Sequence, residues 1–449
     1  MAVDCSAPLP DIPCPTLSDR ADYAMDMQPL PDMLTASLEV LPPGPLHARA
    51  GFWLHQMGQT PPLSDWIAKA SGVGLAVLLC LAARIQEDAS LLIEAERLAE
   101  SEWLSPEIAW SGIGTARLAL GDVPGALVAL THPDAPPTPL TLPALSWLLQ
   151  HLLLSDGDPQ PVLDHLGAGH DAAEALLAVA TRVPDLARAA LSLLPSEQRD
   201  EAALRLLLTG AIPDRLPPVG PTVTVIHAAR QGQVDLARAR LAPLLIERLP
   251  TWRASAPAQA APVYHHLALA CAALSDIEGA LWSLERLAGQ RPRLRGACQV
   301  SVFCPDDRLV SWALAQATDD ETRIESLRQA GRITARLGQH QRARSLLRSA
   351  AALTSQLTAF YPRRLARQVV SSAQIEIGAP LDALTTIDAI DRRRFGDEQR
   401  TAAATALLFA GNSKAATQVL RSFPMGHRRA ESCCAVSAAM FPGSLGPGV

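Results

Sequence analysis

The chain from Trp53 onward is a series of apolar segments of helical length, separated by polar or proline-rich joints. No segment alternates apolar and polar residues for long, and the nearest approach, at residues 222–225, runs straight into a helical pattern. Apolar residues make up 48% of the chain and aromatic residues only 4%, so the core must consist mainly of Leu, Ala, Val and Ile. This composition favours helices over strands. The pattern predicts an all-α fold.

The first 46 residues differ from the rest of the chain. They contain nine prolines and six aspartates and show no sustained period. Such a segment cannot bury enough apolar surface to offset the entropy lost on ordering. We expect a flexible, disordered Pro/Asp-rich leader at residues 1–46, within which residues 34–41 could form a short helix.

Six places share one pattern, in which a helix ends, a short polar turn follows, and a second helix begins with alanine. The turns are at Gly121, Gly232, Ser275, Gly338, Gly378 and Gly411. Five residues later stand Ala126, Ala237, Ala280, Ala343, Ala383 and Ala416, and four further on Leu130, Leu241, Leu284, Leu347, Ile387 and Leu420. Seven residues before the turns stand Gly114, Val225, Ala268, Gly331, Ser371 and Ala404. Five of these six residues are small, with Val225 the exception. Small residues there permit close approach of paired helices, and glycine at the turn supplies the left-handed conformation that ends a helix.

This pattern resembles the tetratricopeptide-repeat family, whose unit of about 34 residues is a helix, a turn and a second helix. The best match runs from Leu327 through Gly331 and Gly338 to Ala350, and the copy around Gly121 carries Trp110 early in its first helix. The 63 residues between Ser275 and Gly338 leave room for a further helix, roughly at 306–317, outside the repeat.

The resemblance implies a right-handed superhelical solenoid of antiparallel helix pairs, whose concave surface is lined by the first helix of each pair and binds a protein or peptide. We expect irregular helical repeats at 47–216, a tetratricopeptide-like array at 217–440 and a C-terminal tail at 441–449. The function that this implies is that of a non-catalytic scaffold or adaptor.

A strongly basic segment lies within the second array. From Arg323 to Arg367 there are ten arginines and one acid, a net charge of +9 in a chain of net charge -6. Three arginines spaced by four share one face of one helix. The predicted partner-binding residues are Arg328, Arg332, Arg336, Arg344, Arg348, Arg363, Arg364 and Arg367, with Gln368, Ser372, His265 and Arg230 at positions that the resemblance places on the concave surface.

Three interpretations of the basic segment remain open. It is a solvated helix face, or a groove for an acidic peptide whose carboxylates the guanidinium groups bind in pairs, or a surface for nucleic acid. Phe360 and Tyr361 are the only aromatic residues in the segment that could stack on bases, and the whole chain is acidic, so nucleic acid is the least favoured partner. The acidic leader could also occupy the arginine face and block it.

Signatures of catalysis and of cofactor or metal binding are absent from the sequence. It contains no G-x-x-x-x-G-K-[ST] loop, H-E-x-x-H motif or G-x-S-x-G motif, so we expect neither an enzyme, a cofactor nor a metal. The alternative is an enzyme or ligand-binding domain whose site is assembled only in three dimensions. No secretory signal or membrane-length apolar segment is present, and the eight cysteines include no C-x-x-C pair. We therefore expect a cytoplasmic protein.

Overall fold

The computed structural model describes residues 29–101, 105–134, 136–138, 141–167, 170–210, 212–248, 257–389 and 396–441. All regular structure in these ranges is helical, with no strand among them, as the pattern predicts. The contacts divide the chain into two compact units. Of the described residues, unit 1 contains 196–406, and unit 2 contains 29–195 together with 407–441.

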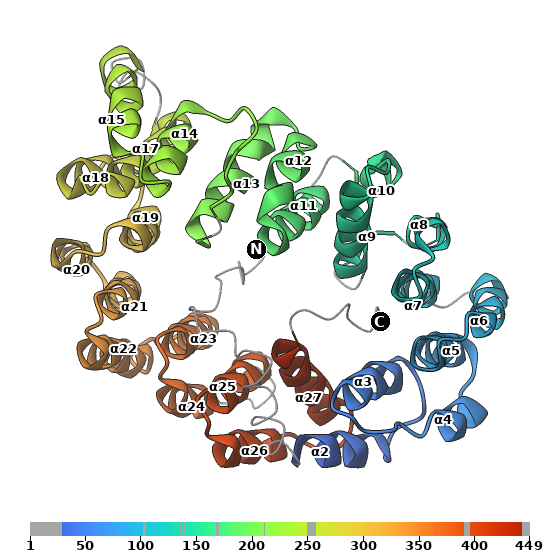
Figure 1. Ribbon diagram of the computed structural model, residues 1–449. Helices are drawn as coiled ribbons and strands as arrows, with labels where there is room; N and C mark the ends of the chain where they lie inside the picture. The colour runs from blue at the N-terminus through green and yellow to red at the C-terminus, as the bar shows by residue number, and fades with distance from the viewer. Residues whose placement is uncertain are drawn as a thin grey trace. The chain divides into compact units, whose positions relative to one another are not determined.

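Unit 2 is formed by helices from both ends of the chain (Figure 1). Its N-terminal part comprises α2 (Pro29–Leu38), α3 (Pro45–Gln56), α4 (Leu63–Lys69), α5 (Gly72–Gln86), α6 (Ser90–Ser101), α7 (Pro106–Ala119), α8 (Val123–Leu130), α9 (Leu142–Leu154), α10 (Gln160–Leu166), α11 (His170–Arg182), η1 (Pro184–Leu186) and α12 (Ala187–Ser192). Its C-terminal part comprises α26 (Ser413–Ser422) and α27 (His427–Met440).

Among the described residues, unit 1 is one continuous stretch of chain, 196–406, apart from the gaps given above. It comprises α13 (Ser196–Leu208), α14 (Pro221–Arg230), α15 (Val234–Pro243), the π-helix η2 (Leu244–Arg248), α17 (Pro257–Ala273), α18 (Ile277–Leu284), α19 (Gln290–Phe303), α20 (Asp307–Ala315), α21 (Asp320–Arg336), α22 (His340–Thr354), α23 (Phe360–Glu376) and α24 (Pro380–Asp388). Helix α25 (Asp397–Phe409) runs from unit 1 into unit 2 along the chain.

The six turns predicted from the sequence all adopt the left-handed conformation. Their φ angles lie between 61° and 81°, and the only residue among them that is not glycine, Ser275, has the smallest value. The alanine five residues after each turn is fully buried, with 0% of its surface exposed in all six copies. The prediction of helix pairs that meet on alanine is therefore confirmed.

The glycine before the turn has the predicted role in the two copies that carry one. A Cβ atom added at Gly331 of α21 would lie 2.8 Å from Cγ of Leu347 of α22, and one added at Gly114 of α7 would overlap Leu130 of α8. Both leucines are nearly or fully buried. A glycine at this position lets the two helices of a pair approach until the leucine of one touches the backbone of the other.

Within unit 1, the helices alternate between two layers (Figure 1). Helices α17, α19, α21 and α23 form the first layer, and α18, α20, α22 and α24 form the second. The helix predicted at roughly 306–317 is α20, and it does not lie outside the repeat. It packs on α19 and α21 as a second-layer helix, so residues 290–315 form an additional pair whose turn lacks glycine.

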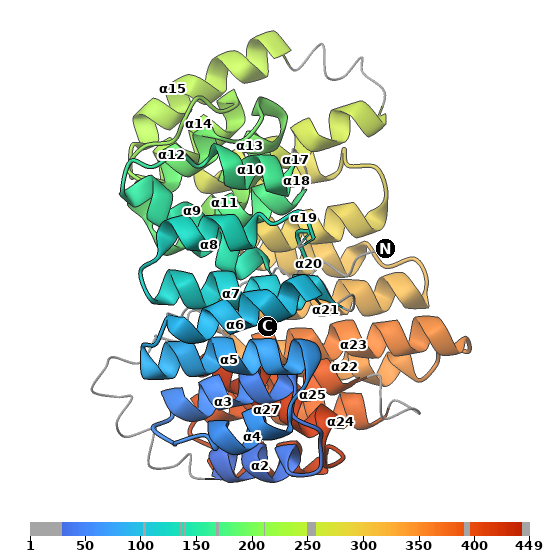
Figure 2. The same cartoon turned by 90° about the vertical axis from the view of Figure 1, so that its right-hand side faces the viewer.

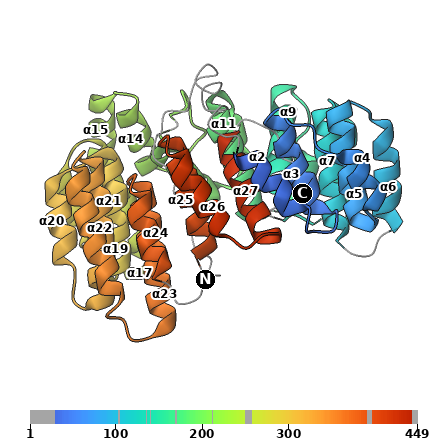
Figure 3. The same cartoon turned by 90° about the horizontal axis from the view of Figure 1, so that it is seen from below.

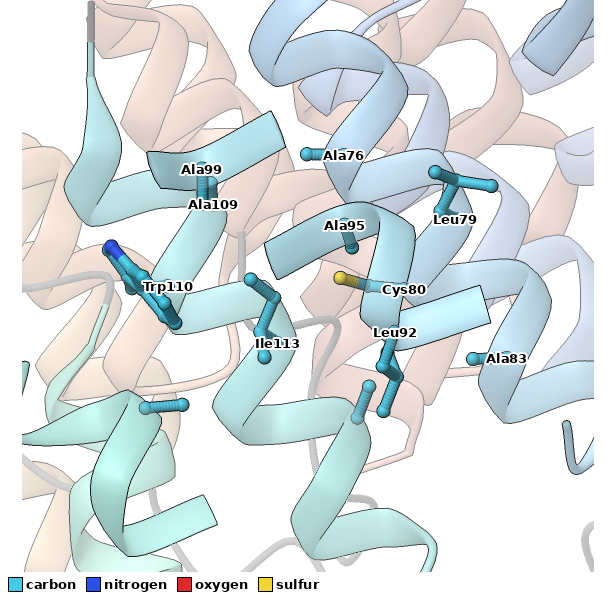
Figure 4. Packing of buried hydrophobic residues seen from close by; sticks show 12 residues of the cluster. Ala76, Leu79, Cys80, Ala83, Leu92, Ala95, Ala99, Ala109, Trp110 and Ile113 are labelled. Atoms are coloured by element: carbon cyan, nitrogen blue, oxygen red, sulfur yellow. The ribbon is translucent and has the colours of Figure 1, made fainter. Parts of the chain in front are cut away.

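The core of unit 2 shows why few aromatic residues suffice. Small and branched side chains of α5, α6 and α7 interdigitate around Cys80 and Ile113, and Trp110 fills the edge of the cluster (Figure 4). Seven of the twelve buried residues of this cluster are alanines. Burial raises the pKa of the Cys80 thiol to about 12, so this cysteine is a core residue.

Part of the predicted leader is structured, because residues 29–46 are among the described residues and include helix α2. Helix α2 begins at Pro29, five residues before the short helix predicted at 34–41, and its buried face packs on α27, with smaller contacts to α3 and α26 (Figures 1 and 3). Trp53 of α3 stacks on Phe441, with ring centroids 6.1 Å apart. Residues 1–28 and the tail from residue 442 lie outside the described residues.

Candidate partner-binding surface

One face of α21 carries Arg328, Arg332 and Arg336, as their spacing predicts. We call these three arginines the ridge. Gly331 faces Leu347 of α22, and Arg332, the next residue, points about 100° away around the helix axis. Their side chains are only 15–28% exposed. The ridge is therefore half-buried, and no more than part of each guanidinium group faces solvent.

Each ridge arginine is paired with an acidic side chain. Nε and Nη2 of Arg328 donate to the two carboxylate oxygens of Glu325, at 2.9 and 2.7 Å. Nε of Arg332 lies 2.7 Å from Oε2 of Glu376 in α23. Nη2 of Arg336 lies 3.7 Å from the same carboxylate, while its Nη1 donates to Ser301 Oγ of α19 at 2.8 Å. The ridge thus connects α19, α21 and α23.

The electrostatics of Glu325 agree with this pairing. Burial raises the pKa of its carboxyl group, but Arg328 and Gln329 lower it more, so that the pKa lies below its ordinary value of 4.5. Because the paired guanidinium groups are held by carboxylates, their remaining N–H groups have fixed directions.

Arg344 and Arg348 lie in the second layer, apart from the ridge. Both donate to the carboxylate of Asp382 in α24, at 3.0 and 2.9 Å. Burial raises the pKa of Asp382, and the two arginines lower it below its ordinary value. Since these side chains are 44% and 61% exposed, they resemble a solvated ion pair more than a binding cluster.

The remaining predicted residues of the basic segment lie on α23. The guanidinium carbon of Arg364 lies 5.2 Å from the ring centre of Tyr361. Arg367 donates to Thr354 Oγ1 at 3.3 Å and to the carbonyl oxygen of Ala389. Ser372 Oγ donates to the carbonyl oxygen of Gln368 at 3.0 Å, and Arg363 also has an interaction of its own.

The least covered face of α23 is a row of four side chains. We call Tyr361, Leu365, Gln368 and Ser372 the α23 stripe; they recur every three or four residues and therefore share one face. Tyr361 is 63% and Leu365 37% exposed. Leu365 was not among the predicted site residues, although its position four residues after Tyr361 was a usable signal. Glu376, the partner of Arg332, follows Ser372 by four residues, so the stripe is continuous with the ridge.

The two outlying predicted residues, Arg230 and His265, contact α19. The guanidinium carbon of Arg230 in α14 lies 5.6 Å from the ring centre of Phe303. His265 Nε2 in α17 lies 2.6 Å from Oε1 of Gln299. Burial lowers the pKa of His265, while the bond to Gln299 opposes this shift. Both side chains therefore have structural partners on α19, in the first layer.

Elsewhere, the described residues contain fewer features of a binding site. A cavity of about 490 Å³ in unit 2 is lined by residues of α3, α4 and α5 and by the loop at 60–62, and it contains none of the predicted residues. The described residues include no group of three or more His, Cys, Asp or Glu side chains arranged to hold a metal ion. None of their helices combines the length and apolarity needed to cross a membrane.

Comparison with known proteins adds no assignment, since no family model, no curated protein and no solved structure matches this chain.

Proposed function

We propose that this protein is a non-catalytic helical-repeat scaffold that binds another protein, or an acidic peptide, on the first-layer face formed by α21 and α23. The observation that carries the proposal is the α23 stripe, in which Tyr361 and Leu365 are exposed and which leads along the helix toward Glu376, the partner of Arg332. Tyrosine and arginine are the side chains that most often dominate the binding free energy of protein interfaces.

The arginines contribute electrostatic complementarity to this surface. Among the described residues, the three ridge arginines on this face pair with two carboxylates, those of Glu325 and Glu376. The arginines outnumber these carboxylates, which favours an acidic partner. The carboxylates of Glu325 and Glu376 already occupy part of each ridge guanidinium group. The α23 stripe therefore supplies the main contact, and the arginines orient the partner.

The test should alter the stripe and leave the ridge intact. Replacing Arg332 with Glu would place its carboxylate against Glu376 and would damage the fold, so loss of binding would be uninformative. The variant Tyr361→Ala with Leu365→Ser removes exposed side chains only. Leu381→Ser on α24 is the matched control, because Leu381 is also an exposed leucine, 54% exposed, in the second layer.

Full-length wild-type and variant proteins are used to capture binding proteins from a nuclease-treated native lysate, with quantitative mass spectrometry. We expect at least one protein captured by both wild type and the Leu381 control to fall about tenfold or more with the stripe variant. Equal capture by all three proteins would contradict binding at the stripe. Dependence of capture on nucleic acid would favour the nucleic-acid alternative.

A further inference from the structure

Helix α15 has an apolar side that no described part of the chain covers. Ala237, Leu241 and Leu244 are buried, the first two facing α14. On the other side, Leu236, Ala239, Pro243 and Ile246 recur every three or four residues and are all exposed. Leu236 is 41% and Ile246 76% exposed. We call these four residues the α15 stripe.

Three other pairs of unit 1 show what covers such a side there. In the second layer, α18 packs on α19, α20 on α21, and α22 on α23, so each helix meets the first helix of the following pair. Helix α15 instead packs closely only on α14 among the described helices, apart from η2, which continues it (Figures 1 and 2). Among the described residues, no following helix packs closely on the corresponding surface of α15.

Two arginines of α15 are unpaired as well. Neighbouring second-layer helices are joined by ion pairs, such as Glu278 to Arg308 at 2.7 Å and Asp307 to Arg342 at 2.8 Å. Arg238 and Arg240 are exposed and make no ion pair or hydrogen bond with any described residue. From their spacing, Arg238 lies on one flank of the α15 stripe and Arg240 on the other, and the exposed Asp235 lies on the flank of Arg238, so these three charges sum to +1.

We propose that the exposed side of α15 is a docking surface for an acidic amphipathic helix of another protein. An apolar row between two arginines is complementary to a helix that carries an apolar row between carboxylates. The stripe from Leu236 to Ile246 is about 15 Å long, so a helix of about three turns covers it. This surface is separate from the α23 stripe, and the inference stands without the function proposed for that stripe.

The binding test uses two synthetic helical peptides with the same leucine row. One has glutamates along both flanks of the row, and the other has lysines at the same positions. Each is labelled, and its affinity for the full-length protein is measured by fluorescence anisotropy at low and moderate salt. The protein variants are Leu236→Gln with Ile246→Gln, and Arg238→Glu with Arg240→Glu. Leu381→Gln is the matched control for loss of an exposed leucine elsewhere.

We expect wild type and the Leu381 control to bind the glutamate peptide and to bind the lysine peptide about tenfold more weakly. The charge-reversed variant should show the opposite preference, and the glutamine variant should lose affinity for both peptides. Circular dichroism verifies that each variant retains its helices. Exposed side chains are replaced in every case, so the fold is expected to persist.

Two results would overturn the inference. The first is that the preference between the two peptides does not reverse when both arginines become glutamates. The second is a dimer in light scattering that the glutamine variant dissociates, since a second copy of this chain would then cover the stripe in place of a partner helix.

Discussion

At the residue scale, Ser275 occupies a turn position that glycine fills in the five other copies. Its φ of +61° is in the left-handed region, which costs a residue with a Cβ atom about 1–2 kcal/mol relative to the right-handed region. Glycine avoids this cost but loses more conformational entropy on folding, by about 0.5–1 kcal/mol. The balance favours glycine at this turn.

We therefore predict that Ser275→Gly raises the free energy of unfolding by about 0.5–1 kcal/mol. The reverse change at an equivalent turn, Gly338→Ser, should lower it by a similar amount, because Gly338 has a φ of +76°. Urea unfolding of the two full-length variants, followed by circular dichroism, measures both effects. A decrease with Ser275→Gly would show that its side chain makes a stabilising contact that outweighs the strain.

At the scale of elements, the ridge is first of all a connection between helices. Glu376 of α23 receives Arg332 and Arg336 of α21, and Arg336 reaches α19. The sequence predicted that the arginines share a face, because that depends only on spacing within one helix. It did not predict the carboxylate partner, because Glu376 lies 40 residues beyond Arg336 and the pairing depends on how neighbouring helix pairs stack.

We predict that Glu376→Ala destabilises unit 1 by about 2 kcal/mol, because it leaves two half-buried guanidinium groups without their carboxylate. Arg348→Ala, which removes one member of an exposed pair with Asp382, should cost less than about 1 kcal/mol. Urea unfolding at neutral pH compares the two variants. Similar small losses for both would mean that the ridge carries no more stability than the surface pairs.

At the scale of the whole molecule, the sequence indicated the helical class and the position of six turns but not which distant helices meet. The turn residues and buried alanines act within one helix pair, so their pattern is local. The contact between α2 and α27 joins segments about 400 residues apart. No local pattern encodes that contact, and the proline content of residues 1–46 pointed to disorder.

In unit 2, the stability of helix α2 therefore depends on its packing against the C-terminal helix α27. Leu30, Leu34 and Leu38 of α2 are almost completely buried, and α2 packs chiefly on α27. A chain truncated after Gly426 lacks α27 and leaves these three leucines without their main cover. Each fully exposed leucine forfeits about 1.5–3 kcal/mol of burial free energy, which exceeds what a ten-residue helix can recover from its own hydrogen bonds.

We predict that truncation after Gly426 removes the hydrogen-exchange protection of α2 and lowers that of α3, while α21–α24 of unit 1 keep theirs. Backbone amides lose protection where local unfolding becomes easy, so exchange followed by mass spectrometry locates the effect. Met425→Gln is the control, because Met425 is 58% exposed and precedes α27; it should leave α2 protected. If α2 stays protected without α27, its stability comes from α3 and α26 alone. The prediction that α2 depends on α27 would then be wrong.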